Sequence, residues 1–270
     1  MKSSAVHHLA AAAALFLGLG QHALAGAPEG IVSAELLSGW QTSEGTYMSG
    51  LHLRMAPGWK TYWRAPGDAG IPPRFDWAGS GNMAAVQVHW PRPKVFQSNG
   101  LRTIGYEHDV VLPIELTPRN PGQPMELRGR VEIGVCQDIC MPMELRLSGN
   151  LPGEGGSDAI RTALAQRPLS AREARVGRVN CQVEPISDGL RLTAEIEVGT
   201  LGPDEAVVFE LPDPSIWVSE AKTARNGSSI VARSDLVPVD GAPFALDRSG
   251  VRITVLGVDQ AVDIRGCQGR

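Results

Sequence analysis

The sequence lacks an excess of positive charge, and after residue 25 it lacks any long apolar segment. Its 25 Lys and Arg residues are outnumbered by 29 Asp and Glu residues. A nucleic-acid-binding protein presents a basic face, so we predict no nucleic-acid partner. No later segment approaches the about 20 consecutive apolar residues that a transmembrane helix needs. We therefore expect a mature chain without a membrane span.

The one apolar run lies near the N-terminus and is short for a membrane span. Lys2 precedes it, and the sequence ALA at positions 23–25 has the small-x-small form of a signal-peptidase site. These features predict a secretory signal peptide over residues 1–25, with an uncleaved anchor as the alternative. We expect the mature, exported chain to begin near Gly26.

Helical periodicity is absent between residues 31 and 147. Short stretches there alternate apolar and polar residues and are separated by Pro and Gly, which is typical of an all-β sandwich or barrel. The sequence LPGEGGSD, which starts at Leu151, has the composition of a linker. After it, Ser157 or Asp158 is placed to cap one short helix. A second set of alternating stretches follows.

We therefore predict an all-β fold with two immunoglobulin-like β-sandwich domains in tandem. The predicted domains are residues 26–150 and 166–270, joined by a linker with a short helix over residues 151–165. Five of the six tryptophans lie in the first half. Core packing explains any single one, but the asymmetry favours an aromatic-walled site in the first domain and a scaffold role for the second.

Cysteine is scarce, and an even count of four in an exported chain points to disulfides. Cys136 and Cys140 flank three residues, which suits a hairpin loop between two strands. Cysteines that face each other across antiparallel strands lie within reach of a disulfide. A bridge that closes so small a loop stabilises the fold by only about 2 kcal/mol or less. The spacing therefore favours a redox-active pair over a purely structural one.

The motif around this pair contains no Lys, Arg or His, and Asp138 would oppose a thiolate. The pair therefore fits a disulfide that a partner's thiolate attacks. Copper(I) binding is an alternative, because Met141 and Met143 are soft ligands next to the cysteines. In a strand, however, both methionines point away from the side of Cys140. A non-catalytic β-sandwich that binds a partner through its aromatic face is the third possibility.

Cys181 and Cys267 open and close the predicted second domain. A bridge between them would close a long loop and stabilise the fold by about 4–5 kcal/mol in the chain-entropy model. We interpret them as a structural disulfide, with free thiols or a second redox pair as alternatives.

Three stretches carry a resemblance to a known family: GWKTYWRAPGDAGIPPRFDW, VHWPRP to IGYEHDVVLPI, and VEIGVCQDICMP. They resemble the N-terminal periplasmic domain of the DsbD family of protein-disulfide reductases, most closely the branch of the ScsB (suppressor of copper sensitivity) proteins. The resemblance covers roughly residues 30–150 and is weaker in the following region. It implies an immunoglobulin-like periplasmic domain that uses no cofactor and relays electrons by thiol–disulfide exchange. The implied donor is a membrane protein acting through a thioredoxin-like domain. The implied targets are thioredoxin-fold proteins, such as disulfide isomerases and cytochrome-c-maturation thioredoxins.

The resemblance also implies roles for individual residues. The catalytic pair corresponds to Cys136 and Cys140. The shielding cap loop corresponds to RPKVFQSNG, with Phe96 as its central aromatic residue. Tyr62 and Tyr106 are the other residues that the resemblance places near the site.

The sequence departs from the family in three respects. Its cysteines are separated by three residues instead of five, and Lys94 and Val95 replace acidic residues of the cap loop. The membrane and thioredoxin-like domains are missing from the chain. We therefore expect a freestanding component of a protein-disulfide reductase system that depends on a separate membrane electron donor of the DsbD type.

Overall fold

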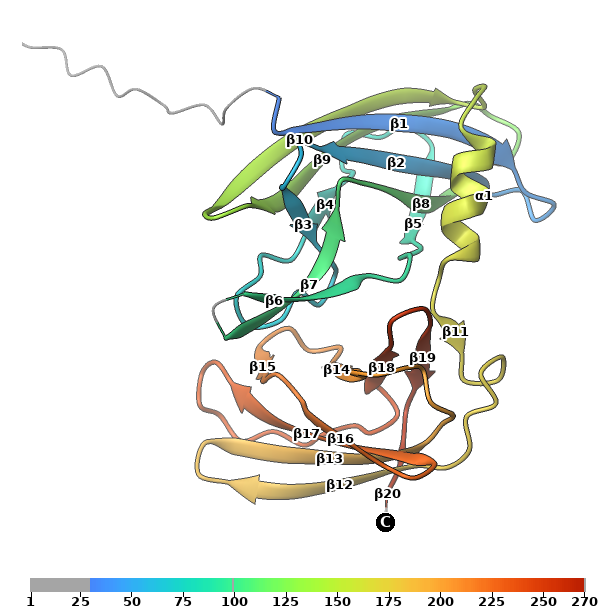
Figure 1. The fold of residues 1–270 in the computed structure, drawn as a ribbon. Coiled ribbons are helices and arrows are strands. Elements are labelled where there is room, and N and C mark those ends of the chain that lie inside the picture. Colours follow the sequence, from blue (N-terminus) through green and yellow to red (C-terminus); the bar gives the residue numbers. More distant parts are fainter. Residues whose placement is uncertain (1–29, 99, 270) are drawn as a thin grey trace, which may run out of the picture.

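The computed structural model describes residues 30–98 and 100–269 of the 270-residue chain. The predicted signal peptide, residues 1–25, lies outside the described residues. Strands dominate the described chain (Figure 1) and form four sheets. Two hydrophobic cores hold these sheets together in pairs. This arrangement confirms the predicted all-β sandwich fold. In the described part of the chain, no helix is long and apolar enough to span a membrane.

Ten strands between residues 32 and 151 build the first half of the molecule. They are β1 (Val32–Gln41), β2 (Tyr47–Met55), β3 (Lys60–Tyr62), β4 (Arg74–Asp76), β5 (Met83–Val88), β6 (Lys94–Ser98), β7 (Leu101–Glu107), β8 (Asp109–Pro118), β9 (Met125–Cys136) and β10 (Cys140–Leu151). One sheet has the order β1-β2-β8-β5. The other has the order β10-β9-β3-β7-β6, and β4 pairs with β9 outside this path.

The core of the first half follows from the period-two alternation of its strands. In β2, Leu51 and Leu53 are buried, and in β9, Leu127, Val131 and Ile133 are buried. Successive residues of a strand point to opposite faces, so these side chains face one another between the two sheets. Each fully buried side chain of this kind contributes about 1.5–3 kcal/mol relative to exposure. The opposite face of β9 points away from this core.

One helix, α1 (Ser157–Ala165), packs against the outside of the β1-β2-β8-β5 sheet. Its Ile160 is fully buried, and a Cβ on Gly50 of β2 would lie 2.8 Å from the Ile160 Cγ1. The predicted capping by Ser157 or Asp158 is wrong, because the cap residue is Gly156 at φ 81° without a side-chain hydrogen bond. The Ser157 hydroxyl instead donates to the carbonyl oxygen of Gly39, 3.2 Å away. Glycine adopts such a left-handed conformation without the steric cost of a side chain.

The second half contains ten further strands. They are β11 (Leu169–Ser170), β12 (Val179–Ile186), β13 (Gly189–Glu197), β14 (Ala206–Glu210), β15 (Ile216–Val218), β16 (Lys222–Asn226), β17 (Ser229–Pro238), β18 (Arg252–Leu256), β19 (Ala261–Arg265) and β20 (Gln268–Gly269). One sheet has the order β11-β19-β18-β14. The other has the order β15-β17-β13-β12-β20, with β16 paired to β17.

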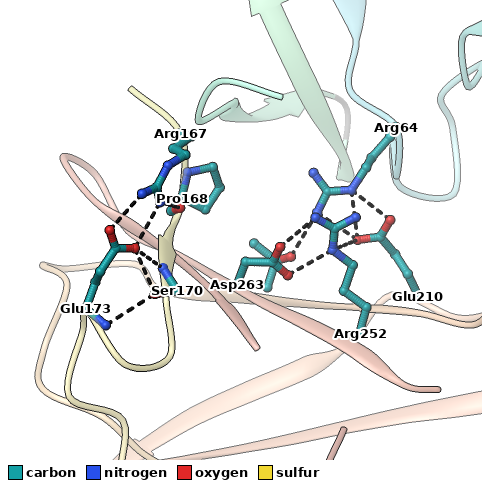
Figure 2. Close-up of polar contacts among 9 residues, drawn as sticks. Arg64, Arg167, Pro168, Ser170, Glu173, Glu210, Arg252 and Asp263 are labelled. Atoms are coloured by element: carbon teal, nitrogen blue, oxygen red, sulfur yellow. Dashed lines mark hydrogen bonds and ion pairs between the residues drawn. The ribbon is translucent and has the colours of Figure 1, made fainter. Parts of the chain in front are cut away.

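The two halves meet through charged side chains at a partly buried junction. Arg64, just after β3, donates from Nε to Glu210 Oε1 at 2.9 Å and from Nη2 to Glu210 Oε2 at 3.0 Å. Figure 2 shows Arg252 beside the same carboxylate and paired with Asp263. A second ion pair joins Arg102 Nε of β7 to Glu220 Oε1 at 2.9 Å. Arg102 lies in β7 and Arg64 lies two residues beyond β3, and both strands belong to the cysteine-bearing sheet.

The segment that follows α1 is ordered by its own polar contacts. The Glu173 carboxylate accepts hydrogen bonds from Arg167 Nη2 at 2.7 Å and from the backbone N–H of Ser170 at 2.8 Å (Figure 2). The backbone N–H of Arg92 donates to the carbonyl oxygen of Gln166 at 2.8 Å. The Arg92 contact attaches the segment to the first half, and the pairing of β11 with β19 attaches it to the second half. The exact domain boundaries stay a prediction.

Candidate functional site

Cys136 and Cys140 stand at the end of a β-hairpin. Cys136 is the last residue of β9, Cys140 is the first residue of β10, and the strand register pairs them directly. Their Cα atoms are 4.2 Å apart, and a disulfide joins their sulfurs. In the loop, the backbone N–H of Gln137 donates to the carbonyl oxygen of Ile139 at 3.2 Å. The hairpin placement predicted from the three-residue spacing is therefore confirmed.

The two sulfur-bearing residues differ in their access to solvent. Cys136 is only 1% exposed, whereas Cys140 is exposed. Ile139, at the tip of the loop, is 66% exposed although it is apolar. Cys140 is therefore the residue of the pair that faces solvent, while Cys136 is covered.

Tyr62 of β3 contacts both sulfurs through its hydroxyl group. The hydroxyl oxygen lies 2.8 Å from Cys136 Sγ and 3.1 Å from Cys140 Sγ. Gly134 makes room for this ring, because a Cβ there would lie 3.0 Å from Tyr62 Cδ2 and 2.6 Å from Ile71 Cβ. Burial raises the pKa of Tyr62, so the hydroxyl keeps its proton near neutral pH. The Tyr62 hydroxyl is therefore a hydrogen-bond donor beside the Cys136–Cys140 disulfide.

Phe96 lies in β6, on the same face of the sheet as the disulfide. The register pairs Lys60 with Cys136 and with Glu107, and it pairs Lys94 with Gly105. Side chains two residues apart share a face, so Phe96 shares the face of Lys60. The Lys60 Nζ lies 5.0 Å from the centroid of the Phe96 ring. The role of Phe96 as a shield for the disulfide stays a prediction.

Tyr106 of β7 is not at the disulfide, which corrects the expectation that it belongs to the shielding group. The register places it opposite Thr61, on the face that packs into the core, and its hydroxyl donates to the carbonyl oxygen of Pro91 at 2.7 Å. Burial raises the pKa of Tyr106 well above the usual value. The physical reason is strand alternation. Cys136, Lys60, Tyr62 and Glu107 lie on one face of the sheet, here called the disulfide face, and Tyr106, next to Glu107 in β7, points to the opposite face.

Sequence reasoning missed two side chains on the disulfide face. Lys60 is paired with Cys136 in the register, and Ile71 packs beside Gly134 and is 36% exposed. A usable signal existed for Lys60, because it is two residues from Tyr62 in one strand and so must share its face. No signal existed for Ile71, which reaches the site from a loop.

Residues 33–152 match the family described as Thiol:disulfide interchange protein DsbD, N-terminal. These residues belong to the DsbD N-terminal domain family. The fold of the chain is similar to the crystal structure of the N-terminal periplasmic domain of ScsB from Proteus mirabilis, with a TM-score of 0.65 and 22% sequence identity. That similarity covers 88% of this chain and 92% of the ScsB domain chain. No curated protein matches the sequence.

The DsbD N-terminal domain of this chain contains the whole disulfide face. Met141 and Met143 pack against the first core, on the opposite face of β10 from Cys140. This confirms the predicted side of the two methionines and separates them from the cysteines as ligands. Within residues 30–98 and 100–269, no group of three or more His, Cys, Asp or Glu side chains is placed to hold a metal ion.

The second disulfide lies outside the DsbD N-terminal domain. It joins Cys181 of β12 to Cys267, just before β20, with a Cα–Cα distance of 5.7 Å and a sequence separation of 86. Cys181 is fully buried in the second core. The bridge thus ties β12, near the start of the second half, to the segment just before β20.

Proposed function

We propose that this protein is a periplasmic thiol–disulfide exchange protein that relays electrons through Cys136 and Cys140. Membership of residues 33–152 in the DsbD N-terminal family supports thiol–disulfide exchange in the periplasm. The single observation that carries the proposal is the environment of the disulfide. One sulfur is accessible at Cys140, and the other is covered at Cys136 under the hydroxyl of Tyr62.

The accessible sulfur determines the order of the chemical steps. A thiolate of a reduced thioredoxin-fold partner attacks Cys140 Sγ, a mixed disulfide forms, and the Cys136–Cys140 bond breaks. The electron pair of that bond goes to Cys136 Sγ, where the Tyr62 hydroxyl donates a hydrogen bond. The second thiolate of the partner then attacks the mixed disulfide and releases Cys140. Two electrons and two protons thus pass to Cys136 and Cys140.

The reduced pair performs the same reaction in the opposite direction on a target. The Cys140 thiolate attacks the target disulfide, and Cys136 then attacks the mixed disulfide, so that two electrons pass on. We propose thioredoxin-fold periplasmic proteins as targets, including those of cytochrome c maturation, and a separate membrane protein of the DsbD type as the donor. In this proposal the Cys181–Cys267 disulfide is structural, and residues 1–25 are a signal peptide.

Single-cysteine variants test the proposal. Cys136→Ser and Cys140→Ser are each activated with Ellman's reagent and mixed with a reduced thioredoxin whose buried cysteine is serine. We expect the thioredoxin to form a mixed disulfide at Cys140 of Cys136→Ser about tenfold or more faster than at Cys136 of Cys140→Ser, because access controls the attack. Mass spectrometry of the captured species identifies the linked cysteine.

Unfolded samples of both variants are the control, and we expect the two rates to converge there. A wild-type disulfide that stays oxidised in every glutathione buffer short of denaturation would contradict the proposal. Equal capture rates for the two folded variants would contradict the assigned order of steps.

A further inference from the structure

Lys60 lies in a row of side chains that crosses the cysteine-bearing sheet. It pairs with Cys136 of β9 on one side and with Glu107 of β7 on the other, and Cys136 pairs with Cys140. Directly opposed residues of antiparallel strands have Cβ atoms about 4.5–5.5 Å apart on one face. Lys60 is therefore the strand neighbour of the covered cysteine.

In the oxidised protein the ammonium group of Lys60 makes a cation–π contact with the ring of Phe96. The ammonium lies 5.0 Å from the centroid of the Phe96 ring. The carboxylate of Glu107 is ion-paired with Lys94, whose hydrogen bond is the largest cause of the lowered pKa of Glu107, while the charge of Lys60 is the last of its named causes. A cation–π contact at a partly exposed site is a weak interaction. Lys60 can leave this contact at little cost, because its four-carbon chain is flexible.

Reduction leaves a negative charge on Cys136 Sγ, which a nearby positive charge would stabilise. When a partner thiolate bonds to Cys140, the Cys136–Cys140 bond breaks and its electron pair stays on Cys136 Sγ. That sulfur is covered, and burial in apolar surroundings disfavours a thiolate. The Tyr62 hydroxyl donates a hydrogen bond but carries no charge. The neighbouring acidic groups oppose the thiolate further.

These neighbours can be named from each element beside Cys136. Negative groups on the same face or loop are Asp138 in the hairpin loop, Glu132 of β9, Glu144 of β10 and Glu107 of β7. Positive groups on this face are Lys94 of β6, which is ion-paired with Glu107, and Arg74 of β4, which the register places opposite Glu132. Among the described residues, Lys60 is the cation that the register places directly opposite a cysteine of the pair.

We propose that Lys60 stabilises the thiolate of Cys136 in the reduced protein, leaving the ring of Phe96 to do so. This inference rests on the proposed exchange function and assigns the residue that compensates the charge of its leaving group. The cysteine motif contains no Lys, Arg or His that could stabilise a thiolate, and Lys60 of β3 would supply this cation from a neighbouring strand.

The test measures one thiol at a time. In a Cys140→Ser background, Cys136 is the lone thiol of the first half, and its ultraviolet thiolate absorbance is followed against pH. We expect Lys60→Met to raise the pKa of the Cys136 thiol by about one unit, the low end of the effect of an opposite charge within about 4–6 Å. Lys60→Arg should stay close to the parent. Lys94→Met is the matched control and should leave the titration unchanged.

The redox equilibrium of the two-cysteine protein gives an independent readout. A cation that stabilises the thiolate favours the reduced form, so its loss favours the disulfide. We expect Lys60→Met to shift the equilibrium with glutathione toward the disulfide by about tenfold above the thiol pKa, matching one pKa unit. Lys60→Arg and Lys94→Met should remain near wild type.

Three results would overturn the inference: an unchanged titration in Lys60→Met, equal shifts in Lys60→Met and Lys94→Met, or equal shifts in Lys60→Met and Lys60→Arg. The titration needs no partner protein, so its outcome is separate from the capture experiment. If thioredoxin captures the wild-type pair while Lys60→Met titrates like the parent, the exchange function stands and the role of Lys60 is wrong.

Discussion

The two disulfides of this protein close loops of very different length. Cys136 and Cys140 are separated by 4 positions, and Cys181 and Cys267 by 86. In the chain-entropy model the short loop stabilises the fold by about 2 kcal/mol and the long one by about 4–5 kcal/mol. The first bridge therefore contributes less to stability and presents an accessible sulfur, while the second joins distant segments of a core.

The two bridges also differ in their polar contacts and in their access to solvent. The first has a tyrosine hydroxyl at both sulfurs and an exposed Cys140 at a hairpin end. The second has Cys181 fully buried among the apolar residues of the second core. In the proposed function, the first bridge serves exchange and the second serves stability, and the two differ in loop length and in solvent access.

The sharpest way to break the comparison is to remove each bridge separately. Cys181→Ala with Cys267→Ala should lower the free energy of unfolding by about 4–5 kcal/mol, and Cys136→Ala with Cys140→Ala by about 2 kcal/mol or less. Guanidinium chloride denaturation measures both. The first variant should still exchange with a thioredoxin, whereas the second should not. Equal losses of stability would mean that the short bridge is as structural as the long one.

A smaller effect is expected at the junction that joins the two halves. Arg64 and Glu210 are mostly buried there, with side-chain exposures of 11% and 21%. Arg64→Met should lower the free energy of unfolding by about 1.5–3 kcal/mol, the range for hydrogen bonds to charged groups. The same denaturation experiment measures it.

Arg54 gives the matched control for this junction. Its ion pair with Glu35 is 2.8 Å long, but both side chains are about half exposed. Arg54→Met should change the free energy of unfolding by about 1 kcal/mol or less. If Arg64→Met is equally mild, the junction does not hold the two halves together.

The smallest effect is expected from removing one hydroxyl at the exchange bridge. Tyr62→Phe keeps the ring and removes the donor at Cys136 Sγ, so the reduced form loses more than the disulfide. We expect the glutathione equilibrium to shift toward the disulfide by about fivefold, which corresponds to about 1 kcal/mol for one hydrogen bond. Tyr106→Phe is the control, because its hydroxyl serves Pro91 on the other face. It should affect stability only, and a redox shift as large as that of Tyr62→Phe would contradict the assignment.

Local pattern accounts for much of the fold and for part of the site. The alternation around Leu51 and Leu53 predicts a strand with one buried face, and β2 has this arrangement from Leu51 to Met55, whereas residues 47–51 are buried on both faces. The three residues between Cys136 and Cys140 predict the hairpin, because both features depend on neighbours in the chain. Tyr106 shows the limit. The family resemblance placed it near the site, but the strand register points its side chain into the core.

Sequence alone therefore determined the strands, the hairpin and the identity of the cysteine pair, since these follow from spacings of a few residues. Only tertiary structure decided that Tyr62 contacts both sulfurs, that Lys60 lies opposite Cys136 and that Arg64 reaches Glu210. The physical reason is that these contacts join residues 74 to 146 positions apart. Their geometry depends on strand order and register, which short-range alternation does not specify.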